Sequence, residues 1–485
     1  MDIQKLAAHV VLLSSPGLGH LIPFIELGNH FALIHTHLKV TLLAVTSQTS
    51  EAETQILNSA MKTNLINIIQ IPSPNIFHLI EYDAAPVTRL CVMMREAKPS
   101  IRKALSNMTL RPSLFIVDIF GTESLSIAKE LRILNYVFVA SHAKFLSLVI
   151  YTPVLDKQIE GQYVDQEEPL KIPGCNLVPP EDVVDPMLDR NSVQYEEYRE
   201  VGNRILESDA ILVNTWEELE HKHLQALRDE DLLGQILNKI PVHGIGPLVR
   251  QRVSETSEEF EPLLQWLDKQ PNESVIYISF GSGGTISFEQ MTELAWGLEL
   301  SQQRFVWVVR APTKVSADAA FFTTKYFNSG DNEVADYLPE GFLSRTNNIG
   351  TLIPEWAPQS SILRHRSVGG FLSHCGWNST LESITNGVPM IAWPLYAEQR
   401  MNATLLVEDL GVAVRPKVLP TKKVVDREEI ASMVREIMVV DENMKRNPIR
   451  GRVKKIRHSA EKALLKGGSS YAAMSRVVKT ITSKS

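Results

Sequence analysis

Residues 356–399 read WAPQSSILRHRSVGGFLSHCGWNSTLESITNGVPMIAWPLYAEQ. Two apolar runs in this stretch, Val368–Ser373 and Pro389–Trp393, are typical of buried strands, and a helical pattern starts between them. Strands that alternate with helices form parallel sheets covered on both faces. The polar residues that follow each strand would lie at the carboxyl edge of that sheet. The stretch therefore predicts a layered α/β fold with a ligand site at one edge.

The same alternation extends outward through most of the chain. The further strand candidates before the stretch are His9–Ser14, Leu38–Val45, Leu65–Ile71, Ser113–Val117, Tyr136–Ala140, Ala210–Thr215, Ser274–Ser279, Arg304–Arg310 and Gly350–Ile353. The series is interrupted by Gly244–Pro262, which is rich in Gly, Pro, Ser and charged residues and is the best linker candidate. Two strand-helix series joined by a polar linker predict two doubly wound α/β domains.

We place the N-terminal domain at residues 1–247, the linker at 248–262 and the C-terminal domain at 263–460. Residues 153–192, rich in Pro and Asp, are interpreted as an irregular excursion from the first domain. Ala311–Tyr337 is polar and is interpreted as a surface loop. The charged C-terminal region from about Asp426 is expected to be helical.

Composition narrows the class of protein. The chain has 485 residues, too many for one ordinary core, and its 44% hydrophobic and 22% charged residues are typical of globular proteins. A net charge of −7 gives no sign of a nucleic-acid surface. The three cysteines, Cys91, Cys175 and Cys375, are far apart, which argues against a metal cluster or a disulfide framework.

No secretory signal or membrane span is evident. The first apolar run, HVVLLSS, is short and lacks a basic leader, and no run of about 18 apolar residues occurs. We expect a cytoplasmic monomer without stable membrane insertion and without a nucleic-acid partner.

A candidate acid–base pair follows two strands of the first series. His20 ends the segment SSPGLGH, where Gly17 and Gly19 permit a tight turn before a helix. The positive end of that helix would favour a neutral imidazole that can accept a proton. Asp118 follows the run SLFIV and would orient the imidazole if the two strand ends are neighbours. The alternatives are a His20 that only caps or packs, and an Asp118 that caps a helix starting near Thr122.

The absence of a nucleophile limits the chemistry of this pair. The chain has no GxSxG elbow, and neither Cys91 nor Cys375 lies in a reactive-cysteine context. Acyl transfer is therefore disfavoured. A base without a nucleophile fits the deprotonation of an acceptor that attacks a bound donor.

Candidate anion-binding residues follow strands of the second series. The segment FGSGGT, Phe280–Thr285, has small residues that let backbone amides and the Ser282 hydroxyl reach an anion, although it also fits a simple tight turn. His374 follows VGGFLS and precedes a helix start whose free amides, with Asn378 and Ser379, form a second anion site.

The remaining polar residues of 356–399 fit a nucleotide and a sugar. Trp356 can offer an aromatic face to a base, although a core tryptophan is the alternative. Glu382 lies one turn beyond Asn378 and can accept from ribose hydroxyls. Glu398 and Gln399 follow the next strand and can bind sugar hydroxyls.

These residues together resemble a known family. Residues 356–399 are similar over their whole length to the signature box of plant family-1 UDP-glycosyltransferases, and PGLGH and FGSGGT agree with it. The resemblance implies the GT-B fold, in which two Rossmann-like domains face each other across a cleft and a C-terminal helix, here 461–485, returns to the N-terminal domain. It also implies a UDP-sugar donor, inversion at the anomeric carbon, and no metal or other cofactor.

The resemblance assigns roles by position. His20 would be the base and Asp118 its partner. The donor-binding residues would be Ser282, Trp356, Ala357, Gln359, His374, Trp377, Asn378, Ser379, Glu382, Glu398 and Gln399. Of these, Trp356 and Ala357 would face uracil, Gln359 and Glu382 would lie near the ribose, and the sugar would meet Trp377, Glu398 and Gln399. The acceptor pocket would include Gly19, Phe120, Ser141 and Tyr396.

The resemblance also narrows the substrates. Glu398, where the family often has Asp, and FGSGGT are similar to the subgroup that acts on monolignols, hydroquinones and related phenols; Gln399 favours UDP-glucose. We therefore expect an inverting O-glucosyltransferase for flavonoids, phenylpropanoids and simple phenols. In the segment ASHAKF, Ser141 is expected to supply a hydroxyl near the sugar, and His142 is either packed or a second group of the acceptor pocket.

Three other functions remain open at this point. A phenolate-activated ring carbon of a flavonoid or phloroglucinol-type acceptor would make the enzyme a C-glucosyltransferase. A non-catalytic UDP-sugar-binding protein would need the donor site without the base. A nicotinamide oxidoreductase would need the complete GxGxxG pattern, which the chain lacks.

Overall fold

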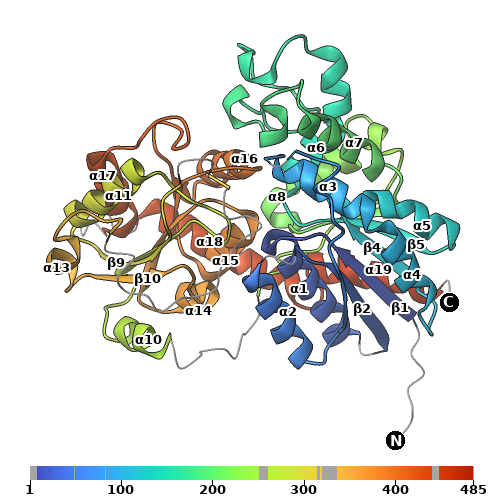
Figure 1. Ribbon diagram of the computed structural model, residues 1–485, viewed down its shortest axis with the longest axis horizontal. Helices are drawn as coiled ribbons and strands as arrows, with labels where there is room; N and C mark the ends of the chain where they lie inside the picture. The colour runs from blue at the N-terminus through green and yellow to red at the C-terminus, as the bar shows by residue number, and fades with distance from the viewer. Residues whose placement is uncertain are drawn as a thin grey trace, which may run out of the picture. The chain divides into compact units, whose positions relative to one another are not determined.

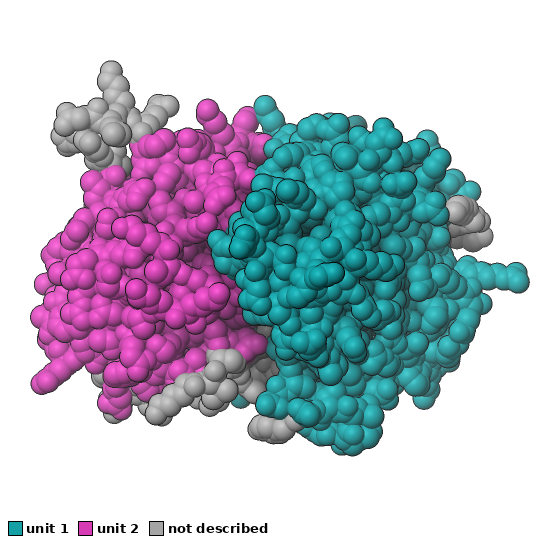
Figure 2. All heavy atoms as spheres, turned by 90° about the horizontal axis from the view of Figure 1, so that it is seen from above, with its two compact units in different colours: residues 1–249, 460–485 teal, residues 250–459 magenta. Residues whose placement is uncertain are grey.

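The computed structural model describes residues 8–35, 37–47, 50–81, 83–250, 260–313, 317–318, 336–439 and 447–483. The chain divides into two compact units, coloured separately in Figure 2. The N-terminal unit comprises residues 1–249 and 460–485, and the C-terminal unit comprises residues 250–459. Most of the expected linker and of the expected loop Ala311–Tyr337 lies outside the described residues.

A seven-stranded parallel sheet forms the centre of the N-terminal unit (Figure 1). Its strands, in chain order, are β1 (Ala8–Ser14), β2 (Leu38–Val45), β3 (Asn67–Ile71), β4 (Leu114–Asp118), β5 (Leu134–Val139), β6 (Ala210–Val213) and β7 (Val242–Gly244). Their spatial order is β3-β2-β1-β4-β5-β6-β7. Every residue of β1 is buried, as expected for a strand covered on both faces. The short edge strand β7 was not predicted.

Helices follow the strands of this unit. They are α1 (Leu18–Ile34), α2 (Glu51–Lys62), α3 (Pro86–Glu96), α4 (Lys98–Ser106), α5 (Leu125–Glu130), α6 (Ala143–Gln158), α7 (Val193–Ile205), α8 (Glu217–Arg228), α9 (Gly234–Leu237) and α19 (Ser469–Ser483). A 3-10 helix, η1 (Ile119–Ser124), follows β4 directly. The apolar face of α19, which includes Met474, Val477 and Ile481, belongs to the same buried core as Val10 and Leu12 of β1.

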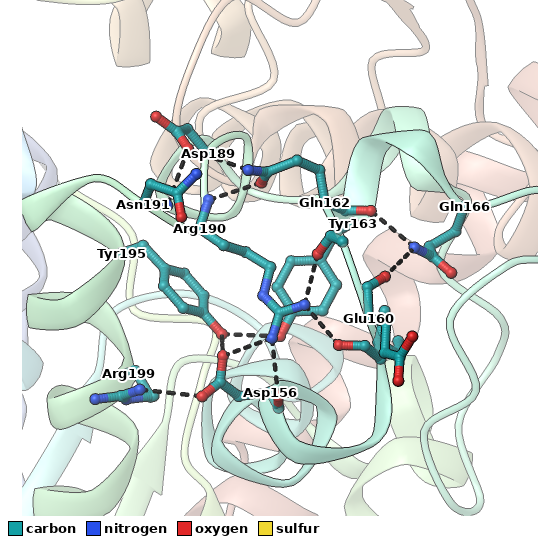
Figure 3. Close-up of polar contacts among 12 residues, drawn as sticks. Asp156, Glu160, Gln162, Tyr163, Gln166, Asp189, Arg190, Asn191, Tyr195 and Arg199 are labelled. Carbon is teal, nitrogen blue, oxygen red and sulfur yellow. Dashed lines mark hydrogen bonds and ion pairs between the residues drawn. The ribbon is translucent and has the colours of Figure 1, made fainter.

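The irregular excursion starts later than predicted. Helix α6 continues to Gln158, so the excursion covers residues 159–192. It contains the 3-10 turns η2 (Tyr163–Asp165), η3 (Pro180–Asp182) and η4 (Asp185–Met187) and one antiparallel bridge between Leu170 and Val178. Arg190 holds it to α6, as Figure 3 shows. Its guanidinium donates to the carbonyls of Ile159 and Gly161 at 2.6 Å each and to the Asp156 carboxylate at 2.9 Å.

A six-stranded parallel sheet forms the centre of the C-terminal unit. Its strands are β8 (Val275–Ser279), β9 (Arg304–Val309), β10 (Gly350–Pro354), β11 (Val368–Ser373), β12 (Met390–Ala392) and β13 (Ala413–Val414), in the spatial order β10-β9-β8-β11-β12-β13. The two residues of β13 were not predicted as a strand. The prediction of two doubly wound, Rossmann-like α/β domains is confirmed.

The helices of this unit complete the fold. They are α10 (Glu261–Asp268), α11 (Phe288–Ser301), α13 (Phe342–Thr346), α14 (Gln359–Arg364), α15 (Trp377–Asn386), α16 (Gln399–Thr404), which runs into a π-helical turn (Leu405–Asp409), and α17 (Arg427–Met438). Helix α18 (Pro448–Leu464) contains the boundary between the units at residues 459 and 460. None of the described helices is long and apolar enough to cross a membrane.

Candidate functional site

Each sheet has one point where the strand order reverses. In the N-terminal unit the chain moves from β1 out to β3 and returns to place β4 beside β1. In the C-terminal unit β8 and β11 are neighbours for the same reason. The carboxyl ends of strands at such a reversal leave a crevice in which doubly wound folds bind their ligands. The candidate residues therefore have to be sought after β1, β4, β8 and β11.

His20 and Asp118 meet at the first of these points. His20 is the third residue of α1, and Asp118 is the last residue of β4. The Nδ1 atom of His20 lies 2.9 Å from Oδ2 of Asp118. The Asp118 side chain is fully buried and that of His20 is 18% exposed. The two side chains are therefore in hydrogen-bonding contact, and the buried carboxylate can orient a partly accessible imidazole.

The start of α1 sets the position of His20. Gly17 is its N-cap with φ 100°, a backbone conformation that favours glycine. The Gly17 amide donates to the buried Glu53 carboxylate at 2.6 Å, which fixes the turn. Gly19, by contrast, lies within the helix, so only Gly17 shapes the turn; a Cβ at Gly19 would meet no atom within 4 Å. The space beside Gly19 is thus open.

Asp118 also caps the 3-10 helix η1. Its Oδ1 atom accepts from the Phe120 amide at 3.0 Å and from the Ser15 hydroxyl at 2.8 Å. The expected helix start near Thr122 was wrong, because η1 begins at Ile119. The two readings of Asp118 are therefore compatible, since one oxygen serves the cap and the other serves His20. Ser15 was not predicted as part of this site, although it lies in the same SSPGLGH segment.

Phe120 and the ASHAKF segment lie at neighbouring strand ends. The ring of Phe120 meets His20 edge-on, with 5.2 Å between ring centroids. Ser141 follows β5 and is buried. His142 is fully buried and is the N-cap of α6, where its Nδ1 atom accepts from the Phe145 amide at 3.2 Å. Of the two readings of His142, the structure therefore supports the packed residue.

A buried carboxylate lies behind this segment. Glu220 accepts from the amides of Ala143 at 2.9 Å and Lys144 at 3.1 Å, and its Oε1 atom is 3.5 Å from Nδ1 of His142 and 3.4 Å from Nδ1 of His223. Burial disfavours its charge, but the adjacent side chains of His142 and His223 hold the pKa of Glu220 well below its ordinary value. The carboxylate thus fixes the first turn of α6.

The second strand-order reversal brings the glycine-rich loop to His374. Gly281 has φ 73°, and a Cβ there would lie 2.3 Å from the His374 ring; a Cβ at Gly376 would lie 2.5 Å from it. Both glycines are therefore required by contact with this imidazole. Burial, with the nearby Arg310 charge, lowers the pKa of His374 to about 3. His374 is consequently neutral at pH 7 and can donate or accept one hydrogen bond.

Helix α15 starts directly after this histidine. Gly376 is its N-cap and, as a glycine, has no side chain that could cap the first amides. Those amides and the helix dipole favour an anion. Trp377 and Ser379, in the first turn, are buried. The loop after β8, His374 and the start of α15 together have the composition of a phosphate-binding site.

The nucleotide candidates of 356–399 form a connected group. The Gln359 amide donates to Ser379 Oγ at 2.9 Å and to Glu382 Oε2 at 2.6 Å. Trp356 contacts Phe260 edge-on, with 5.7 Å between ring centroids, and Ala357 is buried. The start of α14 and the first turns of α15 are therefore side by side, as a common ribose site would require.

The residues after β12 that were predicted to bind the sugar, Glu398 and Gln399, also form hydrogen bonds within their own turn and helix. Gln399 Oε1 accepts from the amides of Leu395 at 2.9 Å and Tyr396 at 3.1 Å. Asn402 donates to the Cys375 carbonyl at 2.8 Å and to Glu398 Oε1 at 3.4 Å. Asn402 was not predicted, although its spacing of four residues from Glu398 places the two side chains on one helix face. Tyr396 is near His374, with ring centroids 6.4 Å apart.

Arg310 was predicted only as the last residue of a strand, but it contacts two loops of the candidate site. Its guanidinium donates to backbone carbonyls of the glycine-rich loop and of Glu355. Among the described residues, no cluster of His, Cys, Asp and Glu is placed to hold a metal ion.

Comparisons with known proteins show the family and the fold of this chain. The family model "UDP-glucoronosyl and UDP-glucosyl transferase" matches residues 242–451. Anthocyanidin 3-O-glucosyltransferase 5 from Manihot esculenta is 58% identical over 467 residues, which are 96% of this chain and 94% of that protein. The crystal structure of TcCGT1 in complex with UDP has a TM-score of 0.89 and 45% identity, covering 99% of this chain and 100% of the other. That of Phytolacca americana UGT2 complexed with UDP-2fluoro-glucose and pterostilbene has a TM-score of 0.84 and 36% identity, covering 98% and 100%.

Proposed function

Because the chain belongs to the plant family-1 UDP-glycosyltransferases and has their GT-B fold, we propose that it transfers glucose from UDP-glucose to a phenolic hydroxyl group, with inversion at the anomeric carbon. The observation that carries the proposal is the hydrogen bond between His20 and Asp118. A neutral imidazole held by a buried carboxylate suits a general base. The similarity to the cassava anthocyanidin 3-O-glucosyltransferase supports a flavonoid or related phenol as acceptor.

The reaction is a single displacement. His20 accepts the phenolic proton as the phenol oxygen attacks C1 of glucose, and Asp118 stabilises the imidazolium that forms. The bond between C1 and the diphosphate oxygen breaks, and its electron pair leaves with UDP. The amides at the start of α15, the Ser282 hydroxyl and the neutral His374 would stabilise the charge that develops on the leaving diphosphate.

The other parts of UDP-glucose would each be bound by different donor-site residues. Trp356 and Ala357 would hold uracil, Gln359 and Glu382 the ribose, and Asn378 and Ser379 the diphosphate. Trp377, Glu398 and Gln399 would contact glucose, with Gln399 using its amide nitrogen because its oxygen accepts from two backbone amides. UDP-glucose is the donor substrate, and the proposal requires no other cofactor.

Product analysis tests this proposal. The protein is incubated with UDP-glucose and a panel of flavonoids, phenylpropanoids and simple phenols, and UDP and products are identified by mass spectrometry and NMR. We expect acid-labile β-O-glucosides. Acid-stable products would instead identify attack by a ring carbon, and UDP binding without turnover of any acceptor would favour a binding protein.

The role of His20 is tested by His20→Ala, with His221→Ala on the exposed face of α8 as the matched control. His20→Ala should lower kcat by about 10² to 10⁴-fold and leave UDP affinity within about twofold. The control should retain wild-type turnover. Near-wild-type turnover of a weakly acidic alcohol by His20→Ala would show that another group is the base.

A further inference from the structure

Arg310 lies between two loops that the proposed function assigns to different parts of the donor. Strand β9 lies between β10 and β8 in the sheet, and Arg310 is the first residue after β9. The glycine-rich loop with Ser282 follows β8, and the turn with Trp356 follows β10. The Arg310 side chain is 11% exposed. Its position therefore allows one largely buried side chain to reach both loops.

The guanidinium of Arg310 contacts both loops. On one side its Nη1 atom donates to the carbonyls of Gly281 and, at 3.3 Å, Gly284. On the other side its Nε atom donates to the carbonyl of Glu355 at 3.1 Å, and the Glu355 carboxylate is 3.8 Å away. Glu355 directly precedes Trp356. The planar guanidinium therefore connects the backbone of the loop expected to bind phosphate with the backbone of the turn expected to bind uracil.

The backbone has a positive φ angle at both contact points. Gly281 has φ 73° and Glu355 has φ 60°, and the latter is uncommon for a residue with a side chain. The hydrogen bonds from Arg310 link the two loops directly at these points.

Arginine suits this task better than lysine. The guanidinium is planar and presents its donors in fixed directions, whereas a lysine ammonium is a point charge on a flexible stem. A lysine at position 310 would keep the positive charge near His374 but would not maintain contacts on both sides at once. Charge and geometry are therefore separable by substitution.

We propose that Arg310 is a positioning residue. It sets the spacing between the turn at Trp356, which would bind uracil, and the loop at Ser282, which would bind phosphate, and it does not touch the donor. This inference rests on the proposed function, because it needs UDP to bind both loops. Its consequence is that the two loops act together: uridine needs one, pyrophosphate needs the other, and only UDP needs their correct separation.

The test compares these three ligands. Affinities of UDP, uridine and pyrophosphate are measured by titration calorimetry, or by competition with UDP where binding is weak, for wild type, Arg310→Lys and Arg310→Gln. Arg345→Lys is the matched control, because Arg345 is a partly exposed arginine of α13 that forms a two-pronged ion pair with Glu299. Thermal unfolding confirms that each variant is folded.

The expected result is a loss of UDP affinity of about tenfold or more in Arg310→Lys, larger than the product of its losses for uridine and pyrophosphate. The control should bind all three ligands as wild type does. A UDP loss equal to that product would overturn the inference, because Arg310 would then act on each loop separately. Unchanged UDP affinity would overturn it as well.

Two further outcomes are distinguishable. If wild type binds no UDP, the proposed function fails and the inference fails with it. If both substitutions prevent folding, Glu355→Gln is tested instead. It weakens the ion pair between Arg310 and Glu355 and leaves the backbone hydrogen bonds of Arg310 in place. UDP affinity should again fall by more than the product of the uridine and pyrophosphate losses, but by less than in Arg310→Lys. Additive losses in Glu355→Gln would overturn the inference.

Discussion

Asp118 binds His20 with one carboxylate oxygen and the backbone of η1 with the other. The Oδ2 atom is 2.9 Å from His20 Nδ1, and Oδ1 accepts from Ser15 and Phe120 at 2.8 and 3.0 Å. A carboxylate held by three hydrogen bonds has little freedom to rotate. The cap of η1 therefore also determines the direction in which the imidazole points.

Asp118→Asn should separate these two roles. The amide oxygen can still accept from Ser15 and Phe120, but the amide nitrogen now faces His20 Nδ1 and favours the wrong tautomer. We expect kcat/KM to fall by about a hundredfold or more, with UDP affinity unchanged and little change in the free energy of unfolding. Steady-state kinetics and urea denaturation measure the two effects.

Ser15→Ala is the control for that substitution, because it removes one hydrogen bond to Asp118 and leaves the His20 contact. It should reduce kcat/KM by less than about tenfold. Asp118→Ala should add a loss of about 1 kcal/mol of stability, since the cap of η1 is also removed. An Asp118→Asn enzyme as active as wild type would show that this carboxylate has no part in the reaction.

The buried His374 predicts a specific pH dependence of stability. Its folded pKa of about 3 lies below the ordinary value of 6.5, so the unfolded chain takes up a proton before the folded protein does. The stability associated with neutral His374 is complete above about pH 6.5 and decreases as pH falls towards 3, by up to about 1.4 kcal/mol per pH unit. His374→Gln should lack this contribution.

The contribution of His374 to stability is measured by urea denaturation of wild type and His374→Gln at pH 7, 6 and 5. The difference in unfolding free energy between the two proteins should become smaller as pH falls. Both should retain the slope due to His30 and His243, whose pKa values burial lowers to about 4. Parallel curves would mean that His374 is protonated in the folded protein.

Glu220 predicts a loss of stability at lower pH. Its folded pKa lies below the ordinary value of 4.5, so its contribution is complete above about 4.5 and is lost as pH falls through the folded value. Glu220→Gln should cost about 3 kcal/mol at pH 7, because it leaves two buried histidines and two helix amides without their carboxylate. The cost should decline below about pH 4.

Glu218→Gln is the matched control, since Glu218 is an exposed residue of the same helix whose partner is the Ser469 hydroxyl. It should change the free energy of unfolding by less than about 0.5 kcal/mol at either pH. A constant cost of Glu220→Gln from pH 7 to pH 3 would contradict an ionised Glu220.

Loss of the Arg190 contacts should loosen residues 159–192 locally and leave the rest of the fold unchanged. Arg190→Met removes the donors to the Ile159 and Gly161 carbonyls and one cation beside Asp156, as Figure 3 illustrates. We expect faster amide hydrogen exchange in residues 159–192, because the free energy of local unfolding of this segment should fall by about 1 to 3 kcal/mol. UDP affinity should be unchanged. Exchange is measured by mass spectrometry.

Arg199→Met should have a smaller effect, because the hydrogen bond assigned to Arg199 goes to Asp156 and not to the excursion backbone. Equal exchange rates in wild type and Arg190→Met would show that the excursion is held by its apolar residues alone.

The sequence predicted the site through a general property of parallel sheets. Polar residues after buried runs, such as His20 after β1 and His374 after β11, lie at the carboxyl edge whatever the strand order is. The family was likewise identifiable from residues 356–399, because the resemblance rests on one continuous stretch of the chain, and that prediction is confirmed. Errors occurred at boundaries, such as the start of η1, where a cap and not a hydrophobic pattern decides.

Strand order and contacts distant in sequence were decided only by the tertiary structure. Asp118 reaches His20 because β4 returns to lie beside β1, and Arg310 connects two loops because β9 lies between β8 and β10. Periodicity does not contain this information, since it records which face of an element is buried and not which element covers it. The sequence by itself determined two doubly wound domains, the family and the candidate residues. The order of the strands decided which of those residues meet.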